Sequence, residues 1–131
     1  MSLDIAIISH ASLDVFSDNL YLGGPASYGG RLLSNLGARF LVTPMVGKNF
    51  PFTEYYERKI KDYLFLPSRK TTTFIMNFNN GLRSLKILDK ADSFTIDLIP
   101  AEVFKSNFIF LSPIVDDMDL NFIKSLFEKA K

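Results

Sequence analysis

The residues best suited to chemistry lie near the N-terminus of the chain. Asp14 follows a short apolar run, and the pair Gly23 and Gly24 directly precedes Pro25. A carboxylate beyond the end of a strand can accept hydrogen bonds from a polyol. Paired glycines before a helix let a ligand approach the backbone and its free N–H groups. Two structural interpretations stay open here: Asp14 as a solvated turn residue, and the glycines as a tight turn alone.

Two other groups of polar residues favour structural roles. His10 is the single histidine of the chain, and we expect it to be structural rather than catalytic. The aspartates at 116, 117 and 119 could suit a divalent metal ion. They lead into a predicted helix, however, where one would cap the helix and the others would favour its positive end. Between residues 58 and 70, the basic side chains are interrupted by Asp62 and preceded by Glu54 and Glu57, which indicates a solvated face rather than a phosphate site.

Composition excludes several classes of protein. The chain has 131 residues, of which 47% are hydrophobic, and its formal net charge is +1. This balance gives no electrostatic signature of nucleic-acid or membrane binding. Without cysteine there is no disulfide framework, and a single histidine argues against a zinc site. No signal peptide or membrane-spanning run is evident, so we expect a cytoplasmic protein.

The elements that must position these residues begin with a strand–helix–strand pattern. Residues 3–9 are apolar and rich in β-branched side chains, which predicts a buried strand. Residues 10–14 predict a polar turn, and residues 15–22 one or two short strands. Residues 40–46 predict a second buried strand, parallel to the first. Pro44 marks the end or the edge of its pairing.

The helix between these two strands has clear end signals. Pro25 suits its first position, where the missing N–H costs nothing, and Gly37 suits its C-terminal cap. Its buried face is predicted to consist of Leu32, Leu33 and Leu36.

The middle of the chain predicts a second helix and then a β-hairpin. The helix is expected over residues 54–63. The hairpin would join residues 71–78 to residues 82–88 through Asn80 and Gly81, which tolerate the positive φ of a type I′ turn. We expect it to be an antiparallel appendage to the parallel sheet.

The last third of the chain continues the alternation of helix and strand. Residues 100–104 predict a helical turn and residues 108–111 a buried strand. An amphipathic helix is expected over residues 117–131. The whole pattern predicts an α/β fold, with a Rossmann-like, mostly parallel sheet and flanking helices, in one domain over residues 1–131. The inward residues of the last helix are predicted to be Leu120, Ile123, Leu126 and Phe127.

Several motifs occur in an order that resembles a known family. Gly23-Gly24 opens a helix that Leu36-Gly37 closes, and Val46-Gly47 follows ten residues later. The segment Thr71-Thr72-Thr73-Phe74 and the segment Leu111-Ser112-Pro113 come afterwards. Between about residues 5 and 125, the chain resembles the N-terminal half of the PfkB-type, ribokinase-like carbohydrate kinases.

The resemblance implies a substrate-binding and lid role. Its members transfer a phosphoryl group from ATP, with Mg²⁺, to an alcohol of a sugar, polyol or nucleoside. The implied substrate-binding residues are Asp14, Gly23, Gly24 and Tyr28, although Tyr28 stands where many members have an asparagine. Lid strands are implied around residues 15–22 and 71–88, with Thr72, Thr73 and Phe74 as lid residues.

The chain departs from the family in one important respect. Members carry a Gly-Ala-Gly-Asp motif with the catalytic aspartate in their C-terminal half, and these 131 residues contain no such motif. We therefore expect a truncated domain that has no catalytic residue of its own and binds neither ATP nor Mg²⁺ strongly by itself. The alternative is a non-catalytic binding module, or a dimerisation module that pairs through the lid hairpin.

Overall fold

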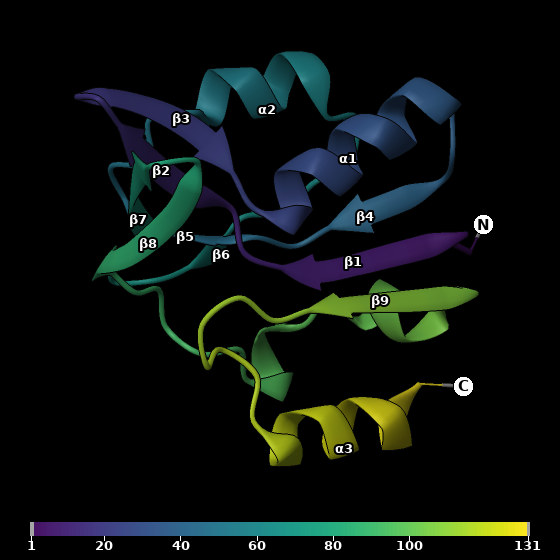
Figure 1. Cartoon of the computed structure of the whole chain (residues 1–131). Helices are drawn as coiled ribbons and strands as arrows, with labels where there is room; N and C mark the ends of the chain where they lie inside the picture. The colour runs from purple at the N-terminus through teal and green to yellow at the C-terminus, as the bar shows by residue number, and fades with distance from the viewer. Residues whose placement is uncertain (1, 131) are drawn as a thin grey trace.

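The structure is a computed structural model that describes residues 2–130 (Figure 1). A three-stranded parallel sheet in the order β4-β1-β9 forms its centre. In Figure 1, helices α1 and α2 lie above this sheet and α3 lies below it. A four-stranded sheet in the order β3-β2-β7-β8 stands at one end. The architecture confirms the predicted α/β class with a mostly parallel central sheet and flanking helices.

The predicted strand–helix–strand unit is present. It consists of β1 (Ile5–Ser9), α1 (Pro25–Leu36) and β4 (Phe40–Val42), and β1 pairs in parallel with β4. The second strand is shorter than predicted, because the chain leaves the central sheet before Pro44. It continues as β5 (Met45–Val46), which pairs with β6 (Leu66–Pro67) in a separate two-stranded sheet. Proline has no N–H for a ladder, which explains the break.

Helix α1 begins and ends where the sequence predicts, but its buried face differs. Pro25 occupies the first turn, and Gly37 caps the helix in the left-handed conformation. Leu32 and Leu36 are exposed, Leu36 at 69%, whereas Ala26, Ser27 and Gly30 are buried. The predicted leucine stripe is therefore wrong except for the partly buried Leu33.

Close packing explains why small residues of α1 are buried while two of its leucines are exposed. A Cβ at Gly30 would lie 3.0 Å from Ile60 Cγ2 and 3.4 Å from Val42 Cγ2, and one at Gly29 would lie 2.6 Å from Ile7 Cδ1. Only small residues fit between α1 and the strands at this distance, so the leucines face outward.

The four-stranded sheet contains the predicted hairpin. Strands β7 (Thr72–Asn79) and β8 (Leu82–Asp89) are joined by Asn80 and Gly81, whose φ angles are 49° and 78°. The prediction of an appendage to the parallel sheet is wrong. The hairpin belongs to a separate sheet, in which β7 pairs in parallel with β2 (Ser12–Phe16) and β2 pairs antiparallel with β3 (Asn19–Gly23).

This sheet also corrects the interpretation of residues 10–14. Ser12 and Asp14 are strand residues of β2, not turn residues. The chain passes from β1 to β2 in two residues, His10 and Ala11, both of which are buried.

Helix α2 covers the same face of the central sheet as α1. It spans Thr53–Lys59 and is shorter than predicted, because the backbone becomes extended at Ile60. The side chain of Tyr56 is fully buried, and its hydroxyl shares a 2.8 Å hydrogen bond with Ser27 of α1. This bond satisfies both buried hydroxyl groups and joins the two helices.

The C-terminal third covers the opposite face. Two 3₁₀ turns, η1 (Ile96–Leu98) and η2 (Ala101–Lys105), precede β9 (Phe108–Ser112) and α3 (Leu120–Lys129). The helical turn after Pro100 is thus confirmed.

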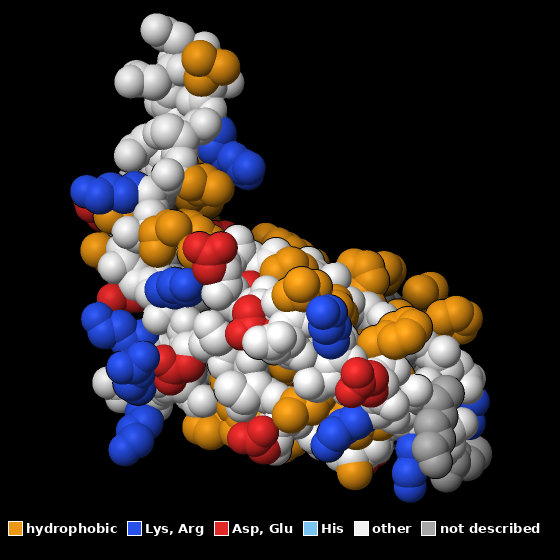
Figure 2. All heavy atoms as spheres, turned by 90° about the horizontal axis from the view of Figure 1, so that it is seen from below, with side chains coloured by type: hydrophobic (Ala, Val, Ile, Leu, Met, Phe, Trp, Pro, Cys, Tyr) orange, Lys and Arg blue, Asp and Glu red, His pale blue; other side chains and the backbone are white. Residues whose placement is uncertain are grey.

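The predicted burial of these last elements is largely wrong. Strand β9 is the outer strand of the central sheet, and Phe108 is 72% exposed, since α1 covers β1 and β4 but not β9. Helix α3 buries Phe122 and Leu126. Leu120 and Phe127 are exposed, the latter at 84%, and Ile123 is only partly covered. Figure 2, which views the molecule from below, shows hydrophobic side chains at the surface of this face.

The core lies in two parts, one on each face of the central sheet. Side chains of β1 alternate between them, since Ile7 joins the part under α1 and α2, and Ala6 and Ile8 join the part above α3. Within residues 2–130, no helix is long and apolar enough to cross a membrane.

The close packing of α1 gives a first prediction. Gly30→Leu should reduce the free energy of unfolding by about 1–3 kcal/mol, because the added side chain must displace Ile60 and Val42. Urea denaturation measures the effect. Asn35→Leu, which adds the same side chain at an exposed position of α1, should change stability by less than about 0.5 kcal/mol. Equal stability of the two variants would contradict the packing described.

Candidate functional site

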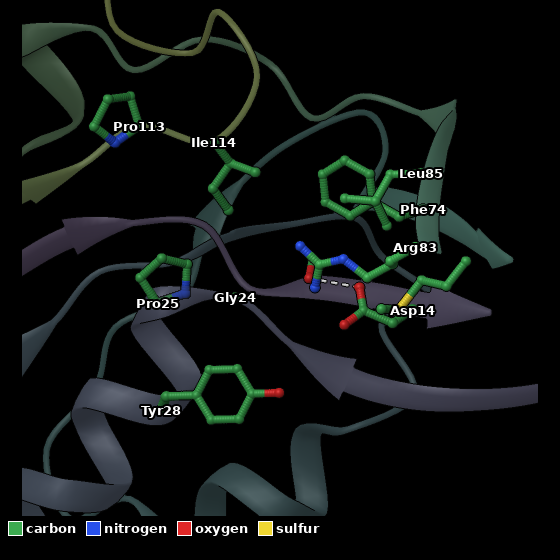
Figure 3. Close-up of a pocket in the computed structure, with 11 residues that line it drawn as sticks. Asp14, Gly24, Pro25, Tyr28, Phe74, Arg83, Leu85, Pro113 and Ile114 are labelled. Carbon is green, nitrogen blue, oxygen red and sulfur yellow. Dashed lines mark hydrogen bonds between the residues drawn. The ribbon is translucent and has the colours of Figure 1, made fainter. Parts of the chain in front are cut away.

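An open groove of about 620 Å³ lies between the four-stranded sheet, the start of α1 and the loop after β9 (Figure 3). Its walls come from three segments that are far apart in the sequence. The lining residues are Ser12, Asp14, Gly24, Pro25, Tyr28, Phe74, Met76, Arg83, Leu85, Pro113 and Ile114.

Strand register places one set of these side chains on a single face of the sheet. Asp14 of β2 lies opposite Phe74 of β7, and Met76 of β7 lies opposite Leu85 of β8. Arg83 is two residues from Leu85, so it shares that face. The groove residues on this face are apolar apart from Ser12, Asp14 and Arg83.

The Asp14 carboxylate is held in the groove by its neighbours on the sheet. The hydroxyl of Ser12 donates a 3.0 Å hydrogen bond to Asp14 Oδ1. Gly23, on the neighbouring strand, makes room for the carboxylate, because a Cβ at Gly23 would collide with Asp14 Oδ2. The structure thus brings together two residues that the sequence analysis singled out. Asp14 can accept further hydrogen bonds from a ligand hydroxyl.

Gly24 fixes where α1 begins. Its φ of +92° favours glycine, and a Cβ there would lie 2.5 Å from the carbonyl oxygen of His10 and 2.8 Å from the nitrogen of Ser12. The helix start is therefore pressed against the turn between β1 and β2. Tyr28, one turn into the helix, is 67% exposed, and its ring stands beside the groove in Figure 3.

The three predicted lid residues are placed differently from one another. Phe74 lines the groove. Thr72 is buried, and its Oγ1 accepts a 3.0 Å hydrogen bond from the backbone N–H of Ala91. Thr73 is buried as well, and its hydroxyl donates to the carbonyl of Thr71 at 3.0 Å. Neither threonine is among the residues that line the groove. The hydrogen bond of Thr72 joins the start of β7 to Ala91, which follows β8.

Sequence reasoning missed part of the groove wall. Met76, Arg83 and Leu85 come from the hairpin, and Ile114 comes from the loop after β9. A signal for the hairpin residues was present, since a two-residue Asn80-Gly81 turn fixes which residues of the two strands share a face. Ile114 has no comparable local signal.

The sequence analysis also did not predict that His10 and Asp117 form a buried pair. His10 Nε2 lies 3.1 Å from Asp117 Oδ2, and both side chains are fully buried. The His10 ring stacks on Phe94 with 4.5 Å between ring centroids. The backbone N–H of Ile114 donates to Asp117 Oδ1 at 3.0 Å. The pair therefore ties the loop that carries Ile114 to the end of β1.

The roles of the neighbouring aspartates follow from this arrangement. Asp119 caps α3 by accepting a 2.7 Å hydrogen bond from the N–H of Phe122, as predicted for one of the three. The expectation that Asp117 favours the helix end is wrong, because its side chain turns inward to His10. Within the described residues, no group of three or more His, Asp and Glu side chains could hold a metal ion.

Three of the five basic residues between positions 58 and 70 form exposed ion pairs, in agreement with the predicted solvated face. Arg58 pairs with Glu54 at 2.6 Å, and Arg69 pairs with Asp92 at 2.8 Å. Lys70 lies 2.8 Å from Asp89.

Comparisons with known proteins were made by sequence and by structure. No family model matches the sequence, and no curated protein matches it. A pyrophosphate-dependent kinase in the ribokinase family is structurally similar, with a TM-score of 0.74 and 18% identity over 97% of this chain and 48% of that chain. A structure of such a kinase complexed with a pyrophosphate analog and myo-inositol gives a TM-score of 0.67 and 18% identity, over 96% and 46%. Ribokinase from Giardia lamblia gives 0.71 and 14%, over 99% and 51%.

The chain has a partial ribokinase-like fold. It spans about half the length of each of these solved structures. At identities below 20% the similarity concerns the fold, so it confirms the predicted ribokinase-like architecture.

The buried His10 gives a prediction on pH dependence. Burial lowers the pKa of His10 below its ordinary value of 6.5, and the nearby Asp117 carboxylate opposes this shift only in part. His10 therefore takes up a proton near pH 6.5 in the unfolded chain, but only at more acidic pH in the folded chain. The free energy of unfolding should keep its full value above pH 6.5. Below pH 6.5 it should fall on acidification, by up to about 1.4 kcal/mol per pH unit.

Urea denaturation at pH 7.5, 6.5 and 5.5 measures this dependence. In His10→Asn, the dependence of the free energy of unfolding on pH should largely disappear over this range. The pKa values of Asp4 and Asp92 are lowered by hydrogen bonds from Arg39 and Arg69, so these carboxylates titrate at more acidic pH. An identical slope in the variant would show that His10 does not control it.

Proposed function

We propose that this chain is the substrate-binding and lid portion of a PfkB-type kinase that phosphorylates an alcohol of a sugar, polyol or nucleoside. The observation that carries the proposal is the placement of Asp14, held by Ser12 and Gly23, in a groove whose other walls are the start of α1 and the hairpin. The partial ribokinase-like fold supports it, and one of the similar structures contains myo-inositol.

Each groove residue would make a different contact with such a substrate. Asp14 accepts hydrogen bonds from one or two substrate hydroxyl groups. Gly24, which lines the groove, would present its backbone to the substrate at the start of α1. Tyr28 and Phe74 offer aromatic faces for the apolar side of a sugar ring. The hairpin β7–β8 then covers the substrate and excludes water.

The groove does not fit a magnesium nucleotide as well as it fits an alcohol. It offers one carboxylate and one guanidinium, and its remaining lining is mainly apolar. Phosphoryl transfer needs groups that position and neutralise the phosphates. We therefore assign no step of the transfer to the groove residues, and we infer that ATP and Mg²⁺ would be bound by a catalytic portion outside these 131 residues.

Titration calorimetry with myo-inositol, fructose, ribose and adenosine tests the proposal. At least one of these ligands should bind, and Asp14→Asn should weaken its affinity by about tenfold or more, because a hydrogen bond to a charged acceptor is lost. Asp62→Asn, an exposed aspartate away from the groove, should bind as the original chain does. Absence of binding by every ligand, or equal affinity in both variants, would contradict the proposal.

A dimerisation module is a second candidate function, and the exposed side chains of the hairpin favour it. Phe78, Leu82, Leu85, Ile87 and Leu88 are all at least 49% exposed. Exposed apolar side chains on an outer strand favour association of two chains.

Sedimentation equilibrium tests this second candidate. A dimer that dissociates in Leu82→Glu but persists in Leu120→Glu, an exposed leucine of α3, is expected from pairing through the hairpin. A monomer at high concentration would contradict it, and so would a dimer that both variants retain.

A further inference from the structure

The loop between β9 and α3 is held in the core by one buried carboxylate. The structure describes all of its residues, 113–119, and none of them belongs to a helix or a strand. Asp117 is 1% exposed and is the only buried residue of this loop, although Met118 packs at the edge of the core. The position of the loop therefore depends mainly on what Asp117 contacts.

Asp117 has contacts on three sides. Its Oδ2 lies 3.1 Å from Nε2 of His10, directly after β1, and its Oδ1 accepts a 3.0 Å hydrogen bond from the N–H of Ile114. Its backbone carbonyl accepts a 2.8 Å hydrogen bond from the N–H of Phe94, whose ring stacks on His10. A buried carboxylate is costly once such partners are lost, so these contacts fix the loop where it lies.

The same loop forms one wall of the groove. Pro113 and Ile114 line the groove (Figure 3). His10 and Asp117 are not among the lining residues, and both are buried in the core. An effect of this pair on a ligand must therefore act through the position of the loop.

The charge of His10 decides how well the loop is held. Burial lowers the pKa of His10, while Asp117, the backbone of Met45 and of Asp92, and more weakly the Asp92 carboxylate, oppose this shift. Asp92 lies after β8 and is paired with Arg69 at 2.8 Å. If the loop left its position, water would reach His10, and its pKa would return toward 6.5. A proton on His10 therefore favours the released loop over the loop in place.

We propose that His10 and Asp117 are positioning residues for the groove: uncharged His10 holds the loop of residues 113–119 in place, and protonated His10 releases it. A released loop takes Pro113 and Ile114 away from the groove. Ligand affinity therefore depends on two residues that do not touch the ligand. In its consequence for a ligand, this inference rests on the proposed function.

Amide hydrogen exchange of the unliganded chain at pH 7.5, 6.5 and 5.5 tests the loop directly. The N–H groups of Phe94 and Ile114 report its release, because both donate to Asp117. The N–H of Thr43, which donates to the carbonyl of Ile7 at 3.0 Å, reports opening of the core. Phe94 and Ile114 should exchange faster than Thr43. After correction for the intrinsic effect of pH, their exchange should accelerate by up to about tenfold per pH unit below pH 6.5.

Variants of the pair identify the groups responsible. His10→Gln carries an amide that can reach Asp117 but gains no charge, so this acceleration should be absent. In Asp117→Ala at pH 7.5, the Phe94 N–H should exchange about tenfold faster or more, although the carbonyl that accepts its hydrogen bond is still present. Asp117→Asn should restore the original rate, because its amide can accept from Ile114 and donate to uncharged His10.

Asp116→Asn is the matched control. It removes a carboxylate from the same loop, but from an exposed position. Its exchange should equal that of the original chain at every pH. The inference is overturned if exchange of Phe94 and Ile114 shows no pH dependence beyond the intrinsic one, if it equals that of Thr43 throughout, or if the acceleration persists in His10→Gln. The pH series on the original chain decides this even where a variant does not fold.

Calorimetry separates this inference from the proposed function. Of myo-inositol, fructose, ribose and adenosine, the ligand that binds most tightly at pH 7.5 should bind about tenfold more weakly to Asp117→Ala, as the loop in place ceases to be the major form. Its affinity for Asp116→Asn should be unchanged. Equal affinity for Asp117→Ala and the original chain would overturn the positioning role.

The two proposals can fail independently. If no ligand binds but exchange shows the expected pH dependence, the hold of His10 and Asp117 on the loop stands and the proposed function fails. If a ligand binds through Asp14 but exchange of the loop is independent of pH, the proposed function stands and this inference fails.

Discussion

The backbone of Gly24 packs against the backbone of His10, and the groove depends on this contact. His10 lies where the chain leaves the central sheet for the four-stranded sheet, while Gly24 begins α1. Because a Cβ at Gly24 would lie 2.5 Å from the His10 carbonyl oxygen, a larger residue would push the helix away from β2. Beneath this contact, the buried pair of His10 and Asp117 fixes the loop that carries Ile114. One turn thus positions three walls of the groove.

The groove combines a mainly apolar surface with a small number of charged groups, as small-molecule sites generally do. Its carboxylate is oriented by a serine hydroxyl and by the space that Gly23 leaves. Its guanidinium lies on a hairpin whose base is held by the hydrogen bond between Ala91 and the buried Thr72. The outer part of the four-stranded sheet therefore combines a fixed base with an exposed tip. That division is consistent with the lid role proposed above.

Features governed by a few neighbouring residues were predictable from the sequence. Pro25 and Gly37 mark the ends of α1, Asn80 and Gly81 mark the hairpin turn, and the strand–helix–strand order indicates a parallel pair. Each of these follows from backbone conformation that is local to the residues concerned. The faces of the helices were not predictable in this way. Hydrophobicity favoured the leucines of α1 as its buried side, but the short distance between helix and sheet admits only small residues there.

The candidate site likewise combines features that were predictable from local sequence with features that depend on tertiary packing. The sequence by itself determined that Asp14, Gly23 and Gly24 precede a helix, and that Phe74 lies on a hairpin strand. Only the tertiary structure decided that β2 pairs with β7, which puts Asp14 beside Phe74, and that His10 meets Asp117 from the other end of the chain. Backbone preferences act over a few residues, whereas strand pairing and burial join segments whose separation leaves no periodic trace in the sequence.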